Sequence, residues 1–570
     1  MSDYSYLNKI FEVINNNLKN REFKSAEESL KKILEKNPQN VKALFLLGSV
    51  YLELKQFKDS TKLLNKAIDL DPNISNAHNN LGIIYFKQRD FKKAKMCIFK
   101  SLEINPKNLD AYNYLGLIYS ELGDFENAID KIKKALEINK NYFPGYNNLG
   151  LIYKKFEYFH DAEISFKKAI SINYKFTNSY YNLMELYEKT NQSEKLNELI
   201  LEFEKLFKIN SISTLYKSHL LYKKESFLDA IKNLEILSFN NDSSQEIDRV
   251  NLLAKCYDKI DDIDNAFSYF EKTNALNLRN LNKEIDKNRF LNKVKIRIDC
   301  FEKFNETKFF SSKKNKNYKP IFMVGFPRSG TTLLDTILRS HPMIEVIEEK
   351  PATNKLINSL NKLTNNSLIN INDIDSKKVE EINLNYFEEI TSYSKKSDFK
   401  KIYIDKLPLN IIYIAEIQKI FPEAKFIISL RHPCDCVLSC FIQNFKLNDS
   451  MSNFLNLNDT ANLYDLVMRL YTIYKKKISF NFTEVKYENI VTNFNSEIKK
   501  LLEFLDVPWN DSVLEYQKTA KQRERIFTPS YDQVIKPLYT KSIGRWTKYK
   551  PKLSRVYSTL EPWISEFGYE

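Results

Sequence analysis

The strongest structural signal in the chain is Pro320-Ile-Phe-Met-Val-Gly-Phe-Pro-Arg-Ser-Gly-Thr-Thr-Leu-Leu334. Its apolar residues 321–324 predict a buried strand, a glycine-bearing loop follows, and the threonines predict the start of a helix. A strand, a loop and a helix N-terminus in this order bind an anion through backbone N–H groups. The glycine spacing is typical of a nucleotide-phosphate loop, but Thr331 stands where such a loop carries lysine. We therefore expect a phosphate site that does not serve the γ-phosphate of ATP.

The residues after this stretch predict an α/β domain with a parallel sheet, because short apolar strands alternate with helical segments. Two of the strands, within residues 401–406 and 424–431, end in the cations Lys406 and Arg431. Ligands of open parallel sheets bind at the carboxyl ends of the strands. We therefore expect Lys406 and Arg431 to lie beside the phosphate loop, although the three segments are distant in sequence.

The first half of the chain repeats with a period of 34 residues, and each glycine of the period is followed three residues later by tyrosine. These glycines are Gly48, Gly82, Gly116 and Gly150. A single helical hairpin cannot bury its apolar face alone, so repeats of this kind stack. The pattern resembles the tetratricopeptide repeat, strongly over residues 7–174 and more weakly over 175–278. We expect an all-α solenoid of about seven or eight helical hairpins.

Asparagines recur in register two or three residues before the glycine position of the repeat. They are Asn79, Asn80, Asn113, Asn147, Asn148 and Asn182. Stacked hairpins form a concave groove, and an asparagine side chain can pair with both backbone groups of an extended peptide. We therefore expect a protein or peptide in the repeat groove. The alternative is that an asparagine-rich chain fills solvated positions with asparagine.

Length and composition predict a multidomain protein, because 570 residues exceed one ordinary hydrophobic core. We expect a repeat domain at residues 1–278, a helical connector and linker at 279–318, and an α/β domain at 319–570. The net charge of +14 comes without a nucleic-acid-binding motif, so no nucleic-acid partner is expected. No apolar run approaches the ~18 residues of a membrane helix. The N-terminus lacks the pattern of a signal peptide, so we expect a cytoplasmic protein.

Three motifs in the second half together resemble the sulfotransferase family. Gly325-Phe-Pro-Arg-Ser-Gly-Thr-Thr-Leu333 resembles its 5′-phosphosulfate loop, and Leu430-Arg-His-Pro433 with Ser439 resembles its 3′-phosphate motif. Residues 529–549 resemble the C-terminal motif of bacterial tetratricopeptide sulfotransferases, which are relatives of protein-tyrosine sulfotransferases. The resemblance implies 3′-phosphoadenosine 5′-phosphosulfate (PAPS) as the nucleotide donor, and no metal.

The resemblance also implies which residues bind this donor. The phosphosulfate site would consist of Arg328, Ser329, Gly330, Thr331 and Thr332. The 3′-phosphate site would consist of Arg431 and Ser439, with Arg545 and Lys548 closing over it. Arginine suits both sites because its planar fork pairs two anion oxygens at once. The resemblance puts Tyr487 near the adenine, whereas its residue type fits core packing equally well.

Catalysis of sulfuryl transfer, like that of phosphoryl transfer, is mostly positioning and charge stabilisation. The resemblance implies that Lys406 stabilises the leaving phosphate oxygen, together with Arg328, and that Glu349 is the general base. Relatives carry Gly-Glu where this chain has Glu348-Glu349, so Glu348 is the alternative base.

We expect the acceptor to be a protein tyrosine that the repeat domain recruits. A saccharide or small metabolite and a repeat scaffold with an inactive sulfotransferase domain are the alternatives. The sequence leaves the oligomeric state open.

Overall fold

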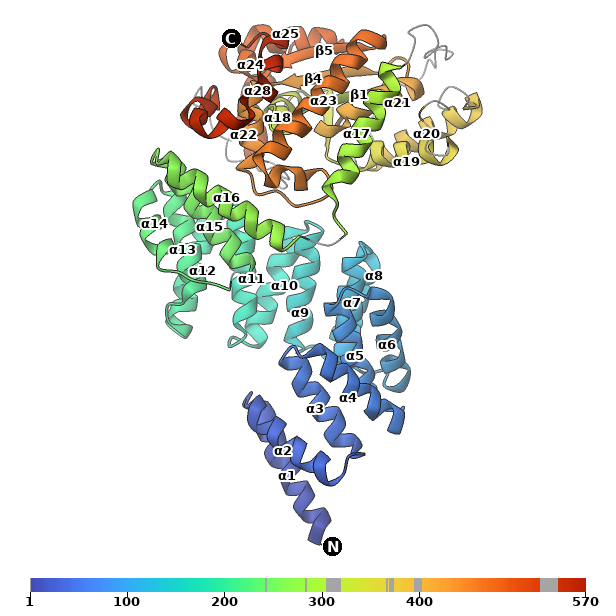
Figure 1. Cartoon of the computed structure of the whole chain (residues 1–570), viewed down its shortest axis with the longest axis vertical. Helices are drawn as coiled ribbons and strands as arrows, with labels where there is room; N and C mark the ends of the chain where they lie inside the picture. The colour runs from blue at the N-terminus through green and yellow to red at the C-terminus, as the bar shows by residue number, and fades with distance from the viewer. Residues whose placement is uncertain are drawn as a thin grey trace. The chain divides into compact units, whose positions relative to one another are not determined.

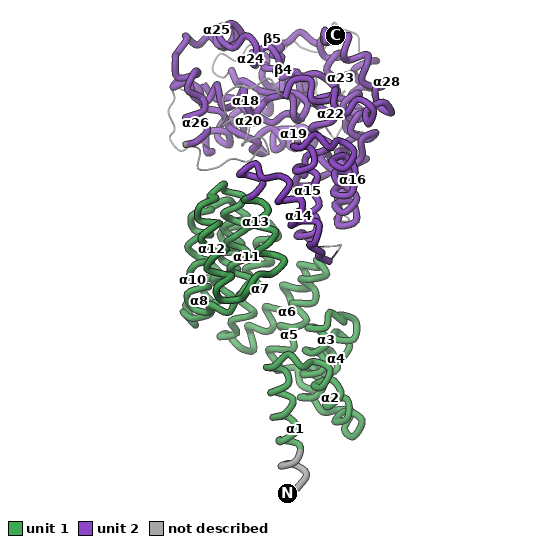
Figure 2. The backbone as a smooth tube through the Cα atoms, turned by 90° about the vertical axis from the view of Figure 1, so that its left-hand side faces the viewer, with its two compact units in different colours: residues 1–220 green, residues 221–570 purple. Residues whose placement is uncertain are grey.

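A computed structural model describes residues 2–240, 243–281, 284–303, 319–364, 368, 374–393, 402–522 and 542–569, with side chains from residue 7 onward. The chain divides into two compact units, Met1–Leu220 and Leu221–Glu570 (Figure 1, Figure 2). Residues 304–318 of the predicted linker and 529–541 of the predicted C-terminal motif lie outside the described residues. The domain boundaries expected at residues 278 and 318 stay a prediction.

Unit 1 is built from successive helices of similar length. They are α1 (Ser2–Lys19), α2 (Phe23–Lys36), α3 (Val41–Glu53), α4 (Phe57–Leu70), α5 (Ser75–Lys87), α6 (Phe91–Ile104), α7 (Leu109–Glu121), α8 (Phe125–Ile138), α9 (Phe143–Lys155), α10 (Phe159–Ile172), α11 (Thr177–Lys189), α12 (Ser193–Phe207) and α13 (Ser211–Lys223). Local capping defines several of them: the Asp124 side chain, for example, accepts a hydrogen bond from the Asn127 N–H and starts α8.

The repeated glycines have a packing reason that the structure makes visible. A Cβ atom added to Gly116 of α7 would lie 2.7 Å from Ile132 Cγ1 and 2.9 Å from the Ala128 carbonyl oxygen in α8. Real carbon atoms do not approach so closely, so only glycine allows the two helices of this hairpin to pack at their observed separation. The 34-residue period in the sequence therefore records one close helix–helix contact per repeat.

The asparagines of the repeat bond to one another between successive hairpins. Asn148 Nδ2 donates to Asn113 Oδ1 at 3.0 Å, and Asn182 Nδ2 donates to Asn147 Oδ1 at 2.8 Å. Asn79, Asn113 and Asn147 are buried. Part of their hydrogen-bonding capacity thus holds the stack together, which the sequence analysis did not foresee. Their predicted contact with a bound peptide stays a prediction.

Unit 2 begins with helices and continues into a five-stranded parallel sheet. The helices before the sheet are α14 (Phe227–Glu235), α15 (Ser244–Lys259), α16 (Ile263–Arg279) and α17 (Lys287–Glu302). The strands are β1 (Ile321–Gly325), β2 (Ile344–Glu348), β3 (Ile402–Lys406), β4 (Lys425–Leu430) and β5 (Asn481–Lys486), in the order β2-β3-β1-β4-β5. All four strand pairs are parallel.

The remaining helices of unit 2 cover the sheet and follow its strands. They are α18 (Thr331–Arg339), α19 (Ala352–Leu363), α20 (Ser376–Ser392), α21 (Ile414–Ile420), α22 (Pro433–Phe441), α23 (Leu457–Lys477), α24 (Tyr487–Thr492), α25 (Phe494–Phe504), α26 (Tyr516–Gln522) and α28 (Lys550–Glu566), with a short 3₁₀ segment at Arg545–Tyr549.

The fold class predicted from the sequence is confirmed. In the described part of the chain, the successive helices α1 to α16 come first, and an α/β domain with a parallel sheet follows.

The central strands β1 and β4 are buried on both faces, because their side chains alternate between two apolar clusters. Phe322 and Phe426 face a cluster that includes residues of α21, α22, α23 and α28. Met323 and Ile427 face a second cluster that includes residues of α18 and α25. Phe267 of α16 belongs to the first cluster, so the helical pair α15–α16 shares a core with the sheet.

Candidate active site

The loop between β1 and α18 has the geometry of an anion cradle. Gly330 adopts a φ of +101°, and a Cβ atom at this position would lie 2.7 Å from the Tyr487 ring. Thr331 and Thr332, at the start of α18, are buried. Ser329 is 1% exposed, and its Oγ has no hydrogen-bond partner among the described residues. Buried hydroxyls are rarely left unpaired, so this orphaned group fits a site whose ligand supplies the partner.

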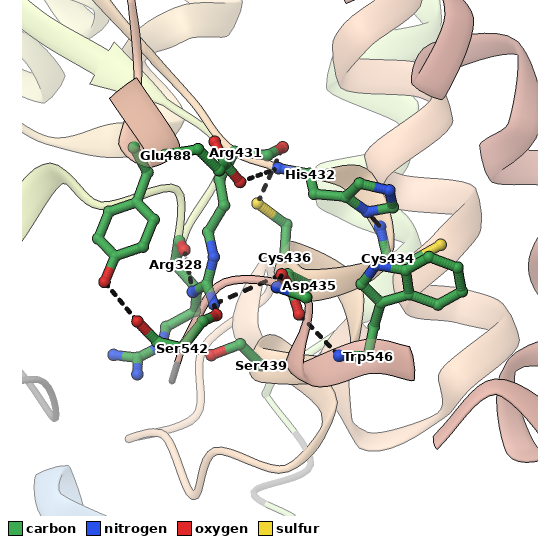
Figure 3. A network of polar contacts seen from close by, with 12 residues as sticks. Arg328, Arg431, His432, Cys434, Asp435, Cys436, Ser439, Glu488, Ser542 and Trp546 are labelled. Carbon is green, nitrogen blue, oxygen red and sulfur yellow. Dashed lines mark hydrogen bonds and ion pairs between the residues drawn. The ribbon is translucent and has the colours of Figure 1, made fainter. Parts of the chain in front are cut away.

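Two of the predicted arginines meet directly behind this loop (Figure 3). Arg328 Nε donates to Ser439 Oγ at 3.0 Å, and Arg431 Nη1 donates to the Arg328 carbonyl oxygen at 3.3 Å. The pKa of Arg328 is lowered to about 10, mainly by burial and also by the nearby charges of Arg431 and Arg545. Positive charges gathered in a buried place repel one another, and an anion would relieve that repulsion. The structure thus brings Arg328 together with Arg431 and Ser439, which lie more than 100 residues later in the chain.

The segment after residue 541 joins this cluster. Arg431 Nη2 donates to the Ser542 carbonyl oxygen at 2.5 Å, and its guanidinium carbon lies 4.9 Å from the centre of the Tyr487 ring. The Tyr487 hydroxyl lies 2.6 Å from Ser542 Oγ. The predicted residue Tyr487 therefore borders both the loop at Gly330 and the Arg431 side chain.

Asp435 is a residue of this network that sequence reasoning missed. It is 1% exposed in the first turn of α22, and its carboxylate accepts hydrogen bonds from the Gly544 and Trp546 N–H groups, both at 2.8 Å (Figure 3). His432, which begins the same helix, stacks on the Trp546 ring at 4.9 Å. The position of Asp435, four residues after Arg431 and at a helix start, was the sequence signal for this residue, because carboxylates are favoured at helix starts.

The two remaining donor-site predictions have different surroundings. Arg545 forms an ion pair with Asp258 of α15, at 2.7 Å from Nη2 to Oδ1. Lys548 pairs with Asp261, and 54% of its side chain is exposed. The structure therefore brings Arg545 toward Arg328 and Arg431 but leaves Lys548 at the surface.

The carboxyl ends of β2 and β3 hold a second group of charges. Lys406 is fully buried, and its Nζ lies 3.1 Å from Glu348 Oε1 and 3.0 Å from Glu349 Oε1. Burial alone would lower the pKa of Lys406, but the two carboxylates raise it above its ordinary value, so the lysine is an ammonium ion. The Glu349 side chain is 37% exposed, whereas that of Glu348 is 4% exposed.

Asp405 is a further buried carboxyl that the sequence analysis did not assign to the site. Its Oδ2 accepts hydrogen bonds from Thr353 Oγ1 at 2.7 Å and from the Tyr386 hydroxyl at 3.0 Å. Burial raises the pKa of Asp405 to about 6, although these two bonds act in the opposite direction. Asp405 therefore links β3 to α19 and α20 immediately beside Lys406.

Among the described residues, no group of three or more histidine, cysteine, aspartate or glutamate side chains could hold a metal ion. Among the helices described, none combines the length and the apolarity needed to cross a membrane.

The comparisons with known proteins match both halves of the chain. Residues 320–511 match a family model described as the sulfotransferase family, and residues 17–81, 75–108, 109–142 and 143–176 match tetratricopeptide repeat models. An uncharacterized protein of Aquifex aeolicus is 28% identical over 54% of this chain and 41% of its own length. Protein-tyrosine sulfotransferase 1 of Danio rerio is 24% identical over 45% of this chain and 74% of its own length.

A solved tetratricopeptide repeat protein from Parabacteroides merdae is 19% identical, with a TM-score of 0.35 over 44% of this chain and 98% of its own. The match with the Aquifex aeolicus protein, by contrast, spans less than half the length of that relative. Residues 320–511 are a domain of the sulfotransferase family, and the repeats that precede it are tetratricopeptide repeats.

Proposed function

We propose that the protein transfers a sulfuryl group from PAPS to an acceptor hydroxyl, and that this acceptor is a protein tyrosine. One observation carries the proposal: the carboxyl ends of neighbouring parallel strands bring together an anion loop, an arginine cluster and a lysine–carboxylate group. Ligands of open parallel sheets bind at this edge. A donor with two anionic groups, a 5′-phosphosulfate and a 3′-phosphate, fits a surface that combines these cationic groups.

The donor would lie across both parts of the cationic surface. Ser329, Gly330, Thr331 and Thr332 would hold the 5′-phosphosulfate with backbone N–H and hydroxyl groups, together with the guanidinium of Arg328. Arg431, Ser439 and Arg545 would hold the 3′-phosphate. Tyr487 would support the nucleotide, because its ring already packs against Gly330. With Lys548 paired to Asp261 at the surface, its predicted contact with the donor is the weakest of the set.

The lysine–carboxylate group would carry the chemistry. A bond forms between the acceptor oxygen and sulfur while the bond between sulfur and the donor phosphate oxygen breaks. The acceptor proton would pass to Glu349, and Lys406 would stabilise the negative charge on the leaving oxygen. The Lys406 ammonium group already contacts Glu349 at 3.0 Å, so one residue pair serves both ends of the transfer.

The identity of the acceptor rests on the repeats and on the relatives. The Danio rerio relative is a protein-tyrosine sulfotransferase, and this chain adds tetratricopeptide repeats, which commonly bind peptides. We infer that the repeat domain recruits a protein acceptor and that the enzyme works in the cytoplasm. Transfer to a saccharide or small metabolite is the outcome that the acceptor assay would detect instead.

The test begins with the donor. Adenosine 3′,5′-bisphosphate, the product nucleotide, should raise the melting temperature without Mg²⁺; at a hundredfold excess over Kd the stabilisation is about 2.7 kcal/mol. Mg-ATP should raise the melting temperature much less, and stabilisation by Mg-ATP alone would refute the proposal in favour of a kinase. Transfer of labelled sulfate from PAPS should then label tyrosine in protein. Label found only in saccharides or small metabolites would refute the tyrosine assignment.

A further inference from the structure

The position of Arg545 is fixed from two directions. Asp435 accepts hydrogen bonds from the N–H groups of Gly544 and Trp546, the residues on either side of Arg545. These bonds hold the backbone of the segment against the first turn of α22. The guanidinium group itself is paired with Asp258, which lies in α15, near the end of the repeat array.

Asp258 is a fixed partner for this arginine. Its Oδ1 accepts a 2.7 Å hydrogen bond from the Tyr549 hydroxyl in addition to the 2.7 Å contact with Arg545, and its side chain is 16% exposed. Tyr549 is fully buried. A carboxylate that accepts two hydrogen bonds and is largely shielded from water holds one orientation, and it imposes that orientation on the planar guanidinium.

The helical pair α15–α16, which contributes Asp258, is tightly packed against α22 of the same compact unit. The rings of Phe267 in α16 and Phe441 in α22 are 5.3 Å apart, and Asn274 Nδ2 donates to the Phe441 carbonyl oxygen at 2.9 Å. Both Asn274 and Phe267 are buried. The position of Asp258 relative to α22, and so to Arg431 and Ser439, is therefore set by a shared apolar core.

Three other charge pairs join residues 261–271 to residues 548–555, and their acidic side chains are more exposed than that of Asp258. They are Lys548–Asp261, Lys552–Asp264 and Arg555–Glu271. The acidic side chains of these pairs are 65%, 86% and 48% exposed. Exposed pairs contribute little to stability. Lys552–Asp264 and Arg555–Glu271 provide matched controls, because neither pair includes Arg545 or another predicted residue of the donor site.

We propose that Asp258 is a positioning residue of the donor site: it orients the Arg545 guanidinium toward the 3′-phosphate of the donor. The proposal rests on the proposed function, in which Arg545 binds that phosphate. The helical pair α15–α16 would then be a structural part of the nucleotide site.

Orientation, rather than competition, is the role that the geometry favours. A carboxylate that competed with the phosphate would have to give up Arg545 when the donor binds. Here Asp435 bonds to the backbone on both sides of Arg545 and lies 3.9 Å from Arg431 Nη2, so Arg545 lies beside the cationic cluster while it is paired with Asp258. The side chain therefore needs no large movement to reach a ligand there.

The test compares two nucleotides on matched variants of the full-length chain. Asp258→Asn should weaken binding of adenosine 3′,5′-bisphosphate about tenfold, the size of effect expected when one charge-assisted contact loses its alignment. Adenosine 5′-monophosphate, which lacks the 3′-phosphate, should bind the variant as it binds the wild type. Asp264→Asn, which removes the exposed pair with Lys552, should change neither affinity by more than about twofold.

Two further variants separate orientation from a general structural effect. Arg545→Ala combined with Asp258→Asn should bind no more weakly than Arg545→Ala alone, because residues that act through one contact are not additive. Asp258→Glu keeps the charge but moves the carboxylate, so it should show a smaller loss with the same dependence on the 3′-phosphate. The Asp258→Glu variant also provides the test of the proposal if the Asp258→Asn variant does not fold.

Each outcome is decisive. Equal losses for both nucleotides, additive losses in the double variant, or tighter binding by Asp258→Asn would overturn the positioning role. If the wild type binds adenosine 3′,5′-bisphosphate no better than the monophosphate, the proposed 3′-phosphate site itself fails, whatever the Asp258 variants do.

Discussion

At the scale of single residues, the contact of Lys406 with two carboxylates raises the question of which one is the base. Glu348 is in the last position of β2 and is almost fully buried, so an acceptor cannot easily reach it. Glu349 is 37% exposed and adopts a φ of +50°. Left-handed backbone in a residue other than glycine is costly and concentrates at functional sites. Accessibility and backbone strain both favour Glu349.

Glu349→Gln should therefore lower kcat by about 10²- to 10⁴-fold, the usual contribution of a general base. Donor binding should stay within about twofold, because Glu349 contacts the lysine rather than the arginine cluster. Steady-state kinetics and nucleotide titration on the same preparation measure both effects.

Glu348→Gln is the matched comparison. It breaks a buried ion pair, and the loss of such a partner costs about 3–5 kcal/mol, so its main effect should be a lower melting temperature. A stable Glu348→Gln variant without activity, beside an active Glu349→Gln variant, would assign the base to Glu348.

Asp405 predicts a dependence of stability on pH. Its pKa is about 6 in the folded protein and near 4 in an unfolded chain, so the fold favours the protonated form. The folded state then binds more protons, and this contribution to stability is present below about pH 4 and is lost as the pH rises through 6. The loss amounts to roughly 3 kcal/mol.

Asp405→Asn cannot titrate, so its melting temperature should improve relative to the wild type as the pH rises from about 4 to about 6. Asp506→Asn is the control. Asp506 is exposed, and its hydrogen bond with Lys425 lowers its pKa, so most of its titration lies below this range, and the melting temperature of this variant should run nearly parallel to that of the wild type. Parallel melting curves of the wild type and Asp405→Asn over this range would contradict the buried titration.

The residues of the site differ in how far sequence could identify them. Arg328, Lys406 and Arg431 each stand at the end of an apolar strand or in its loop, and parallel topology brings such positions together. Asp435 and Asp258 act by bonding to a segment more than 100 residues away. The helix start after Arg431 is a local signal for Asp435, but no local pattern encodes the distant partner of either residue, so only the folded chain reveals these contacts.

At the scale of elements, the loop between β1 and α18 depends on Gly330. Any side chain there meets two penalties: the φ of +101° is unfavourable, and the added Cβ would lie 2.7 Å from the Tyr487 ring. Gly123 separates the penalties, because its φ is +82° but nothing lies within 4 Å of its added Cβ. The two glycines therefore form a matched pair.

Gly123→Ala should cost about 1 kcal/mol of stability, the backbone term alone. Gly330→Ala should cost more and should weaken binding of adenosine 3′,5′-bisphosphate at least tenfold, because the displaced Tyr487 also supports Arg431. Nucleotide titrations and melting curves of both variants measure the difference. Undiminished nucleotide binding by Gly330→Ala would show that the loop does not hold the donor.

The helices of the repeat were more predictable than their contacts. The 34-residue glycine period predicted the hairpins because one close approach, such as that of Gly116 to Ile132, recurs in every copy. The asparagines also recur, but the period alone cannot tell a groove residue from one that bonds to the next repeat. Asn113 and Asn147 do the latter, at least in part.

At the scale of the whole molecule, the compact units and the sequence repeats divide the chain at different places. The tetratricopeptide pattern continues weakly to residue 278, whereas the second compact unit begins at Leu221. The reason is the shared core: Ala254, Ala266, Phe267 and Phe270 of α15 and α16 are buried in the same cluster as the sheet. The helices α15 and α16 therefore contribute to the stability of unit 2 together with the sheet.

This difference predicts opposite outcomes for two truncated chains. Residues 221–570 keep α15, α16 and Asp258, so this chain should fold and bind adenosine 3′,5′-bisphosphate as the full-length protein does. Residues 279–570 lose those helices and expose the apolar surface that Phe267 and Phe270 cover. Burial of one such side chain is worth about 1.5–3 kcal/mol, so this chain should melt lower or aggregate.

With a protein acceptor, the 221–570 chain should show a raised KM, because most of the repeat groove is gone, and an unchanged kcat. Equal stability of the two chains would show that α15 and α16 are dispensable for the catalytic unit, and an unchanged KM would remove the repeats from acceptor recruitment.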